Sequence, residues 1–578
     1  MRRIVTFVLI ALVAAATLSA SPSGAATRFR FFGSGYGHGI GMSQWGAYGL
    51  AKQGWSADRI LTHFYQGTRV RDDVAYPRRV RVGLAWGLGK VHLTAKEGRV
   101  RLTLGGPGGT VVGEIPRGDT WTVRAGSGAY VIVDDRGDRV GGQTWGSASE
   151  DLFATYEQNG ARLQIPEASD GPGAYSDIRG HLEVDLYSCT DRCRIRLILP
   201  LRLEEYLYGL SEVPSSWPTT ALRAQAIAGR TYAAYILKRY DRRGYCDCDI
   251  TDGTNDQVYA GAAKELGTGG SRWTAAVDAT SGRVVAYDGN LIQAFYAASD
   301  GGHSENVEDA WHGGNGAYAI PWLTGVCDPG EDTSANPWTD WSKSFTAAEV
   351  TSRLRPYTGG IGRVGSFGSI RRGVSGRVVT VVVRGELGQA SISGPQLRAG
   401  LGLWDDRVWI NSDRNIIGAI RNLYDTQMCR PGLPTSKTVD LGHGSRMSFD
   451  VGVVYRNDRA TVTVWLKGAM LGEYQGVGGP KGRLGLPTSR VREPAAAAGG
   501  GCNRCGRIAF EGGRIYWKDG VGAYALWNPV LRAYLDAGGP SGLGYPTSRP
   551  SRSADGDWTA SFERGTITCP SGAGCRVG

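Results

Sequence analysis

Beyond its first residues the chain has no long apolar run, and several common signatures of function are missing as well. A helix that crosses a bilayer needs about 20 apolar residues, and no segment after residue 18 supplies them. No basic helix or aromatic and basic platform is present, so nucleic acid is not an expected partner. The Gly-x-Ser-x-Gly turn of many serine hydrolases is absent, and no Lys-Ser/Thr pair follows the glycine-rich segment near the start. These absences disfavour a membrane-embedded protein, a nucleic-acid binder, a serine hydrolase and a phosphate-binding loop.

The start of the chain has the composition of a secretory signal peptide. Met1-Arg2-Arg3 is basic, residues 4–18 are apolar, and small and polar residues follow. We predict a signal peptide over residues 1–26 and a mature protein that is secreted, extracellular or associated with the cell wall. A retained membrane anchor is the alternative. The formal charge of +11 is spread along the sequence, which favours solubility and attraction to an anionic cell envelope.

The rest of the chain is too long for one hydrophobic core. A chain of about 550 residues forms roughly two to four domains, and its 88 glycines and alternating apolar runs indicate turns and antiparallel sheet. Two helices stand out, a short one at 203–210 and an alanine-rich one at 219–239. The expected fold class is α+β. We expect a strand-rich domain at 27–435 with a central helical segment and a core at 180–330, followed by small β-type repeats at 436–578.

Ten cysteines in an exported chain indicate disulfides. Short spacings favour three local bridges, and a fourth pair would close a longer loop. Cys246 and Cys248 are separated by one residue and stay open between a disulfide and metal ligation. The expected pairs are Cys189 with Cys193, Cys502 with Cys505, Cys569 with Cys575, and Cys327 with Cys429.

One motif recurs about 60 residues further along in the C-terminal part of the chain. Tyr474 and Tyr534 begin the two copies. Each copy continues through Gly-Gly and Leu-Gly-x-Pro-Thr-Ser to a Phe-Glu-x-Gly element at Phe510 or Phe562. Such self-similarity is typical of a repeat module that is separate from a catalytic unit, and the Ala/Gly run at 495–501 is a predicted loop. Stacking on sugars and filling the repeat core both stay open as roles for Trp517, Tyr524, Trp527 and Tyr534.

A short, bent connection joins the two predicted helices and carries Glu212. It covers residues 211–217, and Gly209 lies near the end of the first helix. Apolar neighbours such as Pro214 and Trp217 would raise the pKa of a carboxyl group and keep it protonated, as a general acid requires. Cleavage of a glycosidic bond needs such a proton donor. The alternative role of Glu212 is to cap the following helix.

Two polar clusters lie elsewhere in the sequence. The first is a glycine-rich block at 33–67 that contains His38 and Gln44. Glycines let a backbone approach a ligand closely and adopt positive φ, so we expect His38 to position substrate; a tight structural turn is the alternative. The second cluster contains Ser299 and His303 on either side of Gly301-Gly302. Contact with sugar hydroxyls is expected there, and a turn at the end of a strand is the alternative.

Several sequence blocks together resemble the stage II sporulation protein D (SpoIID/LytB) family. They include Glu-Val-Pro at 212–214 and Asp-Gln-Val-Tyr at 256–259. In the best-known relatives the glycine-rich block closes the domain, whereas here it opens the mature chain, which requires the two ends of the domain to lie close in space. The matching blocks are residues 35–47, 200–214, 221–233, 256–261, 295–303 and 321–323.

The resemblance implies peptidoglycan chemistry. Family members are lytic transglycosylases that cleave glycan strands between MurNAc and GlcNAc and form 1,6-anhydro-MurNAc ends, in cell-wall remodelling. The glutamate of the Glu-x-Pro motif is the acid/base and corresponds to Glu212. One carboxyl group suffices, because the 6-hydroxyl of the substrate itself attacks. Around it we expect substrate or scaffold contacts from His38, Gln44, Gln257, Tyr259, Ser299 and His303.

The chain departs from its relatives where some of them bind zinc. Those relatives place His and Cys ligands between the long helix and the Gln-Val-Tyr motif. Here that segment contains Cys246 and Cys248 but no histidine, and no cysteine precedes Gln257. A tetrahedral zinc site would need two more ligands, so no cofactor is expected to be required and zinc at these cysteines is the alternative. Gly253 is one position late for a calcium-binding loop.

The C-terminal copies resemble LGFP repeats, which implies binding to cell-envelope glycans. Two rival functions stay open. One is a non-catalytic, wall-binding enhancer of an N-acetylmuramoyl-L-alanine amidase, which would make the amidase a partner. The other is a two-carboxylate hydrolase, with Asp300 or Glu305 as the second acid. Glu204 and Glu205, on the short helix, are expected to be solvated.

Overall fold

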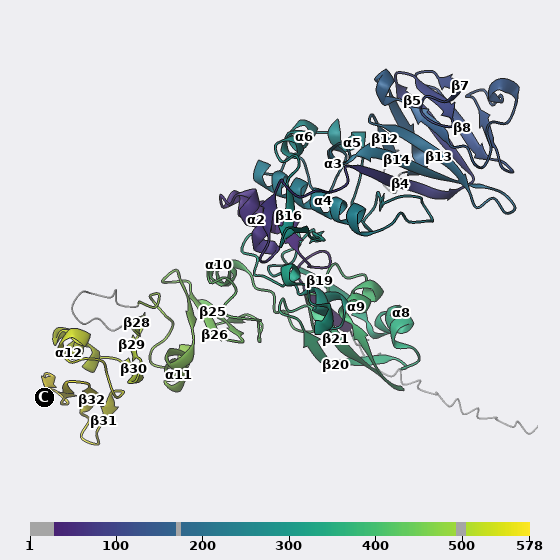
Figure 1. Cartoon of the computed structure of the whole chain (residues 1–578). Coiled ribbons are helices and arrows are strands. Elements are labelled where there is room, and N and C mark those ends of the chain that lie inside the picture. Colours follow the sequence, from purple (N-terminus) through teal and green to yellow (C-terminus); the bar gives the residue numbers. More distant parts are fainter. Residues whose placement is uncertain (1–27, 169–174, 493–503) are drawn as a thin grey trace, which may run out of the picture.

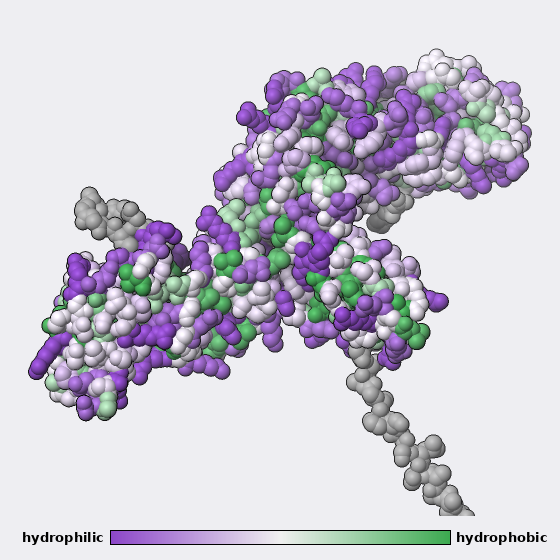
Figure 2. Space-filling view, turned by 60° about the horizontal axis from the view of Figure 1, so that its bottom comes forward, coloured by the Kyte–Doolittle hydropathy of each residue, from purple (hydrophilic) through white to green (hydrophobic). Residues whose placement is uncertain are grey.

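The computed structural model describes residues 28–168, 175–492 and 504–578 and shows an elongated molecule (Figure 1). A strand-rich body in blue lies at one end and the C-terminal repeats in yellow lie at the other, with helices and a second strand-rich unit between them. The face seen in Figure 2 is mostly hydrophilic, with apolar residues in small scattered groups. In the described ranges no helix is long and apolar enough to cross a membrane. The predicted signal peptide, the loop at 495–501 and Cys502 lie outside these ranges.

The strand-rich body consists of two sheets that share one core. Its strands are β4 (Arg79–Leu88), β5 (Lys90–Glu97), β6 (Val100–Leu104), β7 (Thr110–Ile115), β8 (Thr120–Ala125), β9 (Tyr130–Val133), β10 (Leu152–Thr155), β11 (Arg162–Ile165), β12 (Tyr175–Asp177), β13 (His181–Tyr187), β14 (Arg194–Arg202) and β15 (Ile250–Thr251). The larger sheet has the order β15-β4-β14-β13-β10-β6-β7, and the smaller has the order β12-β11-β5-β8-β9. Alternating side chains from both sheets, such as Val82, Leu93, Val123 and Leu197, are buried in one cluster. Because β14 ends at Arg202, the sheet leads the chain directly into the helices.

The helical layer is built around α4 (Thr219–Arg239), which is buried over most of its length. Small residues such as Ala224, Ala226 and Ala228 are fully buried and let neighbouring helices approach closely. The predicted long helix at 219–239 is confirmed with the same bounds, and Pro218 is the residue that precedes its first turn. Its helical neighbours are α1 (Gln44–Lys52), α2 (Ala57–Phe64), α3 (Leu203–Tyr208) and α6 (Gly270–Asp278), and α5 (Ala262–Glu265) packs on α6.

The glycine-rich block ties the helical layer to the second strand-rich unit. β1 (Arg28–Gly33) is the central strand between β19 (Trp341–Thr346) and β23 (Val408–Ile410). Nine residues after the end of β1, β2 (Met42–Ser43) pairs in parallel with β18 (Tyr296–Ala297) and leads into α1. The first part of the glycine-rich block is therefore held at two places by segments that come much later in the sequence.

The second strand-rich unit has its own apolar core, to which Phe31, Val381 and Leu397 contribute. Its main sheet has the order β20-β21-β22 and is covered by two helices (Figure 1). The bounds are α8 (Ala347–Thr358), β20 (Val364–Arg372), β21 (Val378–Gly385), β22 (Gly388–Ser393) and α9 (Gly394–Leu401). Further short elements complete this part of the chain. β16 (Val284–Tyr287) pairs with β3 (Arg69–Arg71) on one side and β17 (Asn290–Leu291) on the other. The helix α7 (Val307–Trp311) follows later in the sequence. The α+β class predicted from the sequence is confirmed.

The C-terminal part repeats one arrangement three times, one more than the two copies found in the sequence. In each copy a helix tyrosine stacks on a strand phenylalanine, with ring centroids 5.5, 4.7 and 4.6 Å apart. A proline forms an isolated bridge to the same phenylalanine in every copy. The additional copy contains Pro-Gly-Leu-Pro-Thr-Ser at 431–436, where Pro431 replaces the first leucine of the motif. The repeats therefore begin before residue 436. The three pairs are Tyr424 with Phe449, Tyr474 with Phe510, and Tyr534 with Phe562.

Each repeat combines a small antiparallel sheet with a short helix. The elements are α10 (Gly418–Thr426), β24 (Val439–Asp440), β25 (Gly444–Phe449), β26 (Gly452–Asn457), β27 (Val462–Leu466), α11 (Gly468–Gly476), β28 (Cys505–Phe510), β29 (Gly513–Lys518), β30 (Gly522–Leu526), α12 (Val530–Asp536), α13 (Gly539–Gly542), β31 (Ser551–Arg552), β32 (Trp558–Phe562), β33 (Gly565–Cys569) and β34 (Arg576–Val577). Trp527 and Tyr534 are buried and fill repeat cores, whereas Trp517 and Tyr524 are partly exposed. The core role is thus confirmed for Trp527 and Tyr534, and stacking on sugars stays a prediction for Trp517 and Tyr524.

Disulfides link neighbouring segments of the described chain. Three predicted pairs are present: Cys189–Cys193, Cys569–Cys575 and Cys327–Cys429. The last pair spans 102 residues and joins the loop after the helical layer to the first repeat. Cys246 and Cys248 are joined to each other.

Candidate active site

Glu212 lies in the bent connection between α3 and α4. Gly209 ends α3, and a Cβ atom added there would lie 2.4 Å from Cε2 of Tyr259, so the backbone passes very close to that ring. The Ser211 N–H donates to the carbonyl of Val258 at 2.8 Å. The side chains of Val213 and Trp217, which follow Glu212, are buried. The connection is therefore fixed on both sides of the glutamate.

The two oxygens of the Glu212 carboxyl group have different partners. Oε1 accepts hydrogen bonds from the Val258 N–H at 2.8 Å and from the Tyr296 hydroxyl at 3.0 Å. Oε2 has one long contact, from the side-chain amide of Gln44 at 3.5 Å. Since the side chain is only partly buried, Oε2 is the oxygen that is available for proton exchange with a bound molecule.

Burial raises the pKa of Glu212 above its ordinary value. Hydrogen bonds from Val258, Tyr296 and Gln44 and the charge of Lys264 act in the opposite direction, but the effect of burial is larger. Lys264 is itself buried and donates to the carbonyl of Val213, and burial lowers the pKa of its ammonium group to about 8. The pKa of Glu212 is therefore shifted in the direction that a proton donor needs.

Gln257 and Tyr296 form a chain of hydrogen bonds behind Glu212. The Tyr206 hydroxyl donates to Gln257 Oε1 at 3.1 Å, and Gln257 Nε2 donates to the Tyr296 hydroxyl oxygen at 2.7 Å. Tyr296 in turn donates to Glu212. Gln257 is fully buried, so it acts on Glu212 through Tyr296 and is not in a position to contact substrate.

A pair of glutamines faces the other oxygen of Glu212. Gln44 is on the first turn of α1 and Gln225 is on α4, and their side-chain amides are 3.4 Å apart. Gln225 is 1% exposed, and its Nε2 atom has no hydrogen-bond partner in the described part of the chain. Gln44 was predicted from the sequence as a site residue, whereas Gln225, Tyr296 and Lys264 were not. Gln225 and Tyr296 lie within the quoted family blocks, but nothing in the sequence marks them as neighbours of Glu212.

Three aromatic rings lie next to the glutamate. Trp45 follows Gln44 in the sequence, and its ring is 4.7 Å from that of Trp217, at the end of the bent connection. Tyr48, one turn further along α1, is 5.2 Å from both tryptophan rings. Trp45 and Tyr48 are partly exposed, so this aromatic group offers flat apolar surface of the kind that stacks on sugar rings.

His38 is near the site but does not contact Glu212. Its Nδ1 atom accepts the N–H of Ile40 at 3.0 Å, as in a tight turn. Its ring lies 5.3 Å from Trp311 and 6.2 Å from Phe295, which precedes Tyr296. Burial lowers the pKa of His38 to about 4. The turn that was the alternative for His38 is present, and the neutral ring belongs to an aromatic cluster beside the site.

The remaining predicted site residues have partners elsewhere. The Tyr259 hydroxyl donates to Asp177 at 2.6 Å, and its ring stacks on Tyr206. Ser299 is fully buried and donates to Glu331. His303 hydrogen-bonds through Nδ1 to its neighbour's carbonyl at 2.7 Å. The structure thus brings Gln44 and, indirectly, Gln257 to Glu212, but not Tyr259, Ser299 or His303.

Four other carboxyl groups weighed from the sequence also have partners away from Glu212. Glu204 is not simply solvated, because it forms an ion pair with Arg230, which is fully buried on α4. Glu205 accepts the Arg202 N–H at the start of α3. Asp300 and Glu305, the suggested second acids, are each 1% exposed, and both accept hydrogen bonds from nearby loops.

The zinc ligands considered at Cys246 and Cys248 do not fit a metal site. The two sulfur atoms are bonded to each other, and zinc needs thiolates. Both side chains are buried, and a Cβ added to Gly83 on β4 would lie 2.6 Å from Cys248 Sγ. The disulfide therefore packs against the sheet as a structural element.

Comparison with known sequences defines the class of this domain. Residues 192–287, which include Glu212 and Gln257, match the SpoIID family, described as stage II sporulation protein. Residues 484–542 match the LGFP repeat. The chain thus contains a segment that matches the SpoIID family, followed by a segment that matches the LGFP repeat, in agreement with the resemblance noted in the sequence.

Individual relatives are similar over part of their length. The chain is 31% identical over 211 residues to Stage II sporulation protein D of Bacillus subtilis, which covers 35% of this chain and 58% of that protein. It is 30% identical over 143 residues to the Amidase enhancer of Bacillus subtilis, covering 25% and 17%. An uncharacterised protein of Brachyspira hyodysenteriae is 32% identical over 163 residues, covering 27% and 40%. The chain spans between 17% and 58% of these relatives.

Proposed function

We propose that the protein is a peptidoglycan lytic transglycosylase that acts outside the cytoplasm in cell-wall remodelling. It would cleave glycan strands between MurNAc and GlcNAc and leave 1,6-anhydro-MurNAc ends. The observation that carries the proposal is the Glu212 carboxyl group, with a raised pKa, one oxygen held by two donors and the other available. The match to the SpoIID family over this segment supports it.

In the proposed reaction a single carboxyl group transfers a proton twice. Protonated Glu212 gives its proton to the glycosidic oxygen through Oε2, and the bond to C1 of MurNAc breaks. The carboxylate that remains is stabilised by the hydrogen bonds to Oε1. It then takes the proton of the MurNAc 6-hydroxyl while that oxygen bonds to C1, which closes the anhydro ring and returns Glu212 to its starting state. The Trp45, Tyr48 and Trp217 rings would stack on the sugars next to the bond that is cleaved.

The substitution Glu212→Gln tests the proposal directly. Gln keeps the size of the side chain but has no proton to give, so we expect the cleavage rate to fall by about 10²–10⁴-fold. Since burial raises the pKa of Glu212, the charged form is disfavoured in the folded state, and the variant should be at least as stable as the wild type. Mass spectrometry of products from peptide-stripped glycan strands would detect the anhydro ends. Glu205→Gln, a nearby carboxyl group at the start of α3, is the matched control and should keep its activity.

The products distinguish the proposal from its rivals. Reducing ends would indicate a two-carboxylate hydrolase. Equal inactivity of wild type and Glu212→Gln on glycan strands, with stimulation of a wall amidase by both, would indicate a non-catalytic enhancer. That second candidate is favoured by one observation, the relative named Amidase enhancer.

The repeats would hold the enzyme on the cell wall. A groove of about 1120 Å³ lies between the first and second repeats, with α10 and β27 along its sides. Trp465 and Trp517 line it together with Arg430, Lys467 and Arg490, and no carboxylate is among its lining residues. Aromatic rings beside cationic groups suit a glycan that carries negative charge. We therefore assign this groove to an anionic glycan of the cell envelope.

Charge reversal in the groove tests this assignment. The double variant Arg430→Glu, Lys467→Glu should bind purified cell wall at least about tenfold more weakly in a pull-down of the full chain. High salt should also weaken wild-type binding, because it screens the attraction. The control Arg99→Glu, Arg136→Glu changes the same charge on exposed positions of the strand-rich body. If both double variants bind the wall as tightly as the wild type, the groove is not the attachment site.

A further inference from the structure

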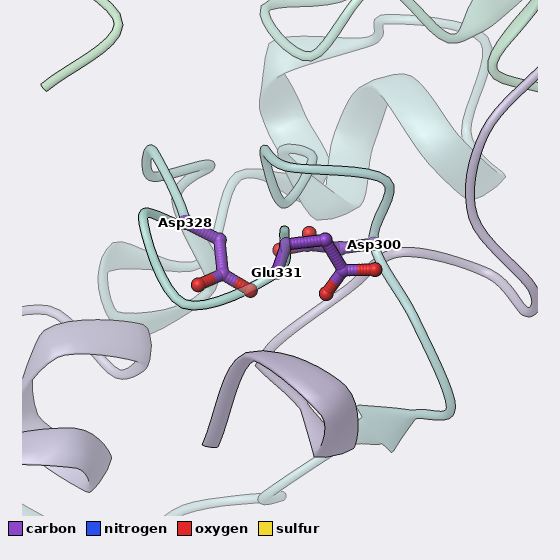
Figure 3. A group of neighbouring side chains, drawn as sticks. All are labelled: Asp300, Asp328 and Glu331. Atoms are coloured by element: carbon purple, nitrogen blue, oxygen red, sulfur yellow. The ribbon is translucent and has the colours of Figure 1, made fainter. Parts of the chain in front are cut away.

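Three buried carboxyl groups meet beneath the N-terminal end of α1. Asp300 follows β18, and Asp328 and Glu331 belong to the loop after Cys327 (Figure 3). One carboxyl oxygen from each residue lies within 4.8 Å of the corresponding oxygens of the other two. None of the three side chains is more than 1% exposed. Like charges so close together and away from water repel each other strongly unless something positive is bound between them.

Two oxygen atoms of this cluster have no hydrogen-bond partner. Asp300 Oδ1 accepts the N–H of Gly302, and Asp328 Oδ1 accepts the N–H of Gly330, each at 2.8 Å. The Oδ2 atoms of both aspartates are buried without a partner in the described ranges. A buried carboxyl oxygen without a partner is costly, so each of these atoms is favourably placed to contact a cation.

The arginines around the cluster do not supply that ligand. Arg377 forms ion pairs with Asp405 and Asp406, and Arg421 forms one with Asp425. Towards the cluster these arginines donate only to backbone carbonyls, including those of Asp300 and Asp328. Arg407 donates to the Ser375 carbonyl and the Ser34 hydroxyl. The cationic side chains nearby thus leave the three carboxyl groups without a direct counter-ion.

Glu331 differs from the two aspartates because donors surround it. One oxygen accepts the Ser299 hydroxyl, the Gly301 N–H and the Asn336 amide, and the other accepts the Ser43 hydroxyl at 2.7 Å. These four donors fix the position of the carboxyl group. Glu331 therefore places its oxygens firmly beside the two unpartnered aspartate oxygens.

We propose that Asp300, Asp328 and Glu331 bind one Ca²⁺ ion. A site made only of oxygen atoms selects hard cations such as Ca²⁺ and Mg²⁺ and disfavours zinc. Ca²⁺ accepts an irregular set of protein oxygens, whereas Mg²⁺ keeps several of its water molecules, for which a fully buried cluster is poorly suited. Backbone carbonyls of the surrounding loops can complete the coordination.

The site would couple the bound ion to the position of Gln44. Ser43 donates to Glu331 and also caps α1 by accepting the N–H of Gly46 at 3.0 Å. A Cβ atom on Gly46 would lie 1.8 Å from Asp328 Oδ2, so this loop packs tightly on the first turn of α1. Gln44, next to Ser43, is the residue that contacts Glu212 Oε2. Ca²⁺ would thus hold the glycine-rich block against the catalytic glutamate.

Calcium titration of the full chain tests the proposal independently of any activity on glycan. After treatment with EDTA and its removal, isothermal titration calorimetry with CaCl2 should show one saturable site per chain, with a Kd of about 10⁻⁴–10⁻³ M. About 10 mM CaCl2 should raise the melting temperature by a few degrees, and MgCl2 should raise it less. A wild-type protein without a saturable calcium site would overturn the proposal.

Single substitutions locate the site. Asp300→Asn and Asp328→Asn each remove one charge from a crowded cluster, so the variants should fold, as circular dichroism would check, and should bind Ca²⁺ at least tenfold more weakly. Asp309→Asn is the control. Asp309 is on nearby α7 and forms an ion pair with Arg371, so this variant should bind Ca²⁺ like the wild type. Unchanged affinity in both cluster variants would place the calcium elsewhere and refute the assignment.

Discussion

At the scale of single residues, the Glu212 carboxyl group is divided between a fixed oxygen and an available one. Val258 and Tyr296 donate to Oε1, whereas Oε2 has only the 3.5 Å contact with Gln44. Two donors on Oε1 stabilise the carboxylate, and burial favours the neutral acid. A group that must first give and then take a proton benefits from this arrangement, because burial favours the acid and the donors to Oε1 stabilise the carboxylate.

The hydroxyl of Tyr296 should therefore set the pH dependence of the reaction. The acid must be protonated, so activity should fall as pH rises through the raised pKa of Glu212. Tyr296→Phe removes a donor that stabilises the carboxylate, so the fall in kcat/KM should move to higher pH, and the maximal rate should drop by about tenfold. The charged groups near this carboxyl group, above all Lys264, are unchanged in the variant.

A pH–rate profile from about pH 4 to 9 would measure this shift. Tyr208→Phe is the control, because it removes a hydroxyl that donates to Asp278 at 2.6 Å on the surface of α3. Its profile should coincide with that of the wild type. A profile for Tyr296→Phe that moves to lower pH would contradict the role given to this hydroxyl.

The candidate site was only partly predictable from its residues. Glu212 was identified by its Glu-x-Pro motif and its apolar neighbours, and Gln44 by its place in the glycine-rich block. Ser299 was expected to contact substrate because it lies between polar neighbours and glycines, yet its hydroxyl is buried against Glu331. A sequence shows which side chains are polar but not the direction in which each one points, and that direction depends on partners distant in the chain.

At the scale of elements, the site depends on how α3 stops. Gly209 ends the helix with ordinary dihedral angles (φ −85°, ψ −3°), so its role is not conformational freedom but the absence of a side chain beside Tyr259. The bent connection, the Val258 N–H and the stacked Tyr206 and Tyr259 rings are all placed by this contact.

Gly209→Ala should consequently disturb both stability and activity. The new methyl group would meet the Tyr259 ring at 2.4 Å, and overpacking of this kind costs about 1–3 kcal/mol. Urea unfolding followed by circular dichroism would measure the loss in stability, and the rate of glycan cleavage should fall as Glu212 shifts. Gly253→Ala, on a loop with no atom within 4 Å of the added Cβ, is the control. If both variants are equally stable, the close contact at Gly209 has no energetic importance.

Helices were easier to predict than the pairing of strands. α4 is rich in alanine and has a proline before its first turn, signals that act within a few residues. The position of β1 between β19 and β23 has no such local signal, since its partners lie more than 300 residues away. Only the apolar alternation of its buried positions was visible in the sequence, and alternation does not identify a partner.

At the scale of the whole molecule, the part that contains Glu212 and the C-terminal repeats are arranged along one long axis (Figure 1). The first repeat was missed because Pro431 occupies the position of the motif's first leucine, although the Tyr424–Phe449 stack and the Pro434–Phe449 bridge keep the same arrangement. The structural motif is thus conserved within the chain where the sequence motif has changed.

If the protein acts on the cell wall as proposed, the bridge between Cys327 and Cys429 has a mechanical consequence there. Cys429 lies two residues before the first repeat motif at 431–436, and Cys327 immediately precedes Asp328. A pull on the repeats, transmitted from a strand that they hold, would pass through this bond and bypass the 102-residue segment between the cysteines. The second strand-rich unit would be spared the load. The force would arrive at the loop that packs on the first turn of α1, the turn that carries Gln44.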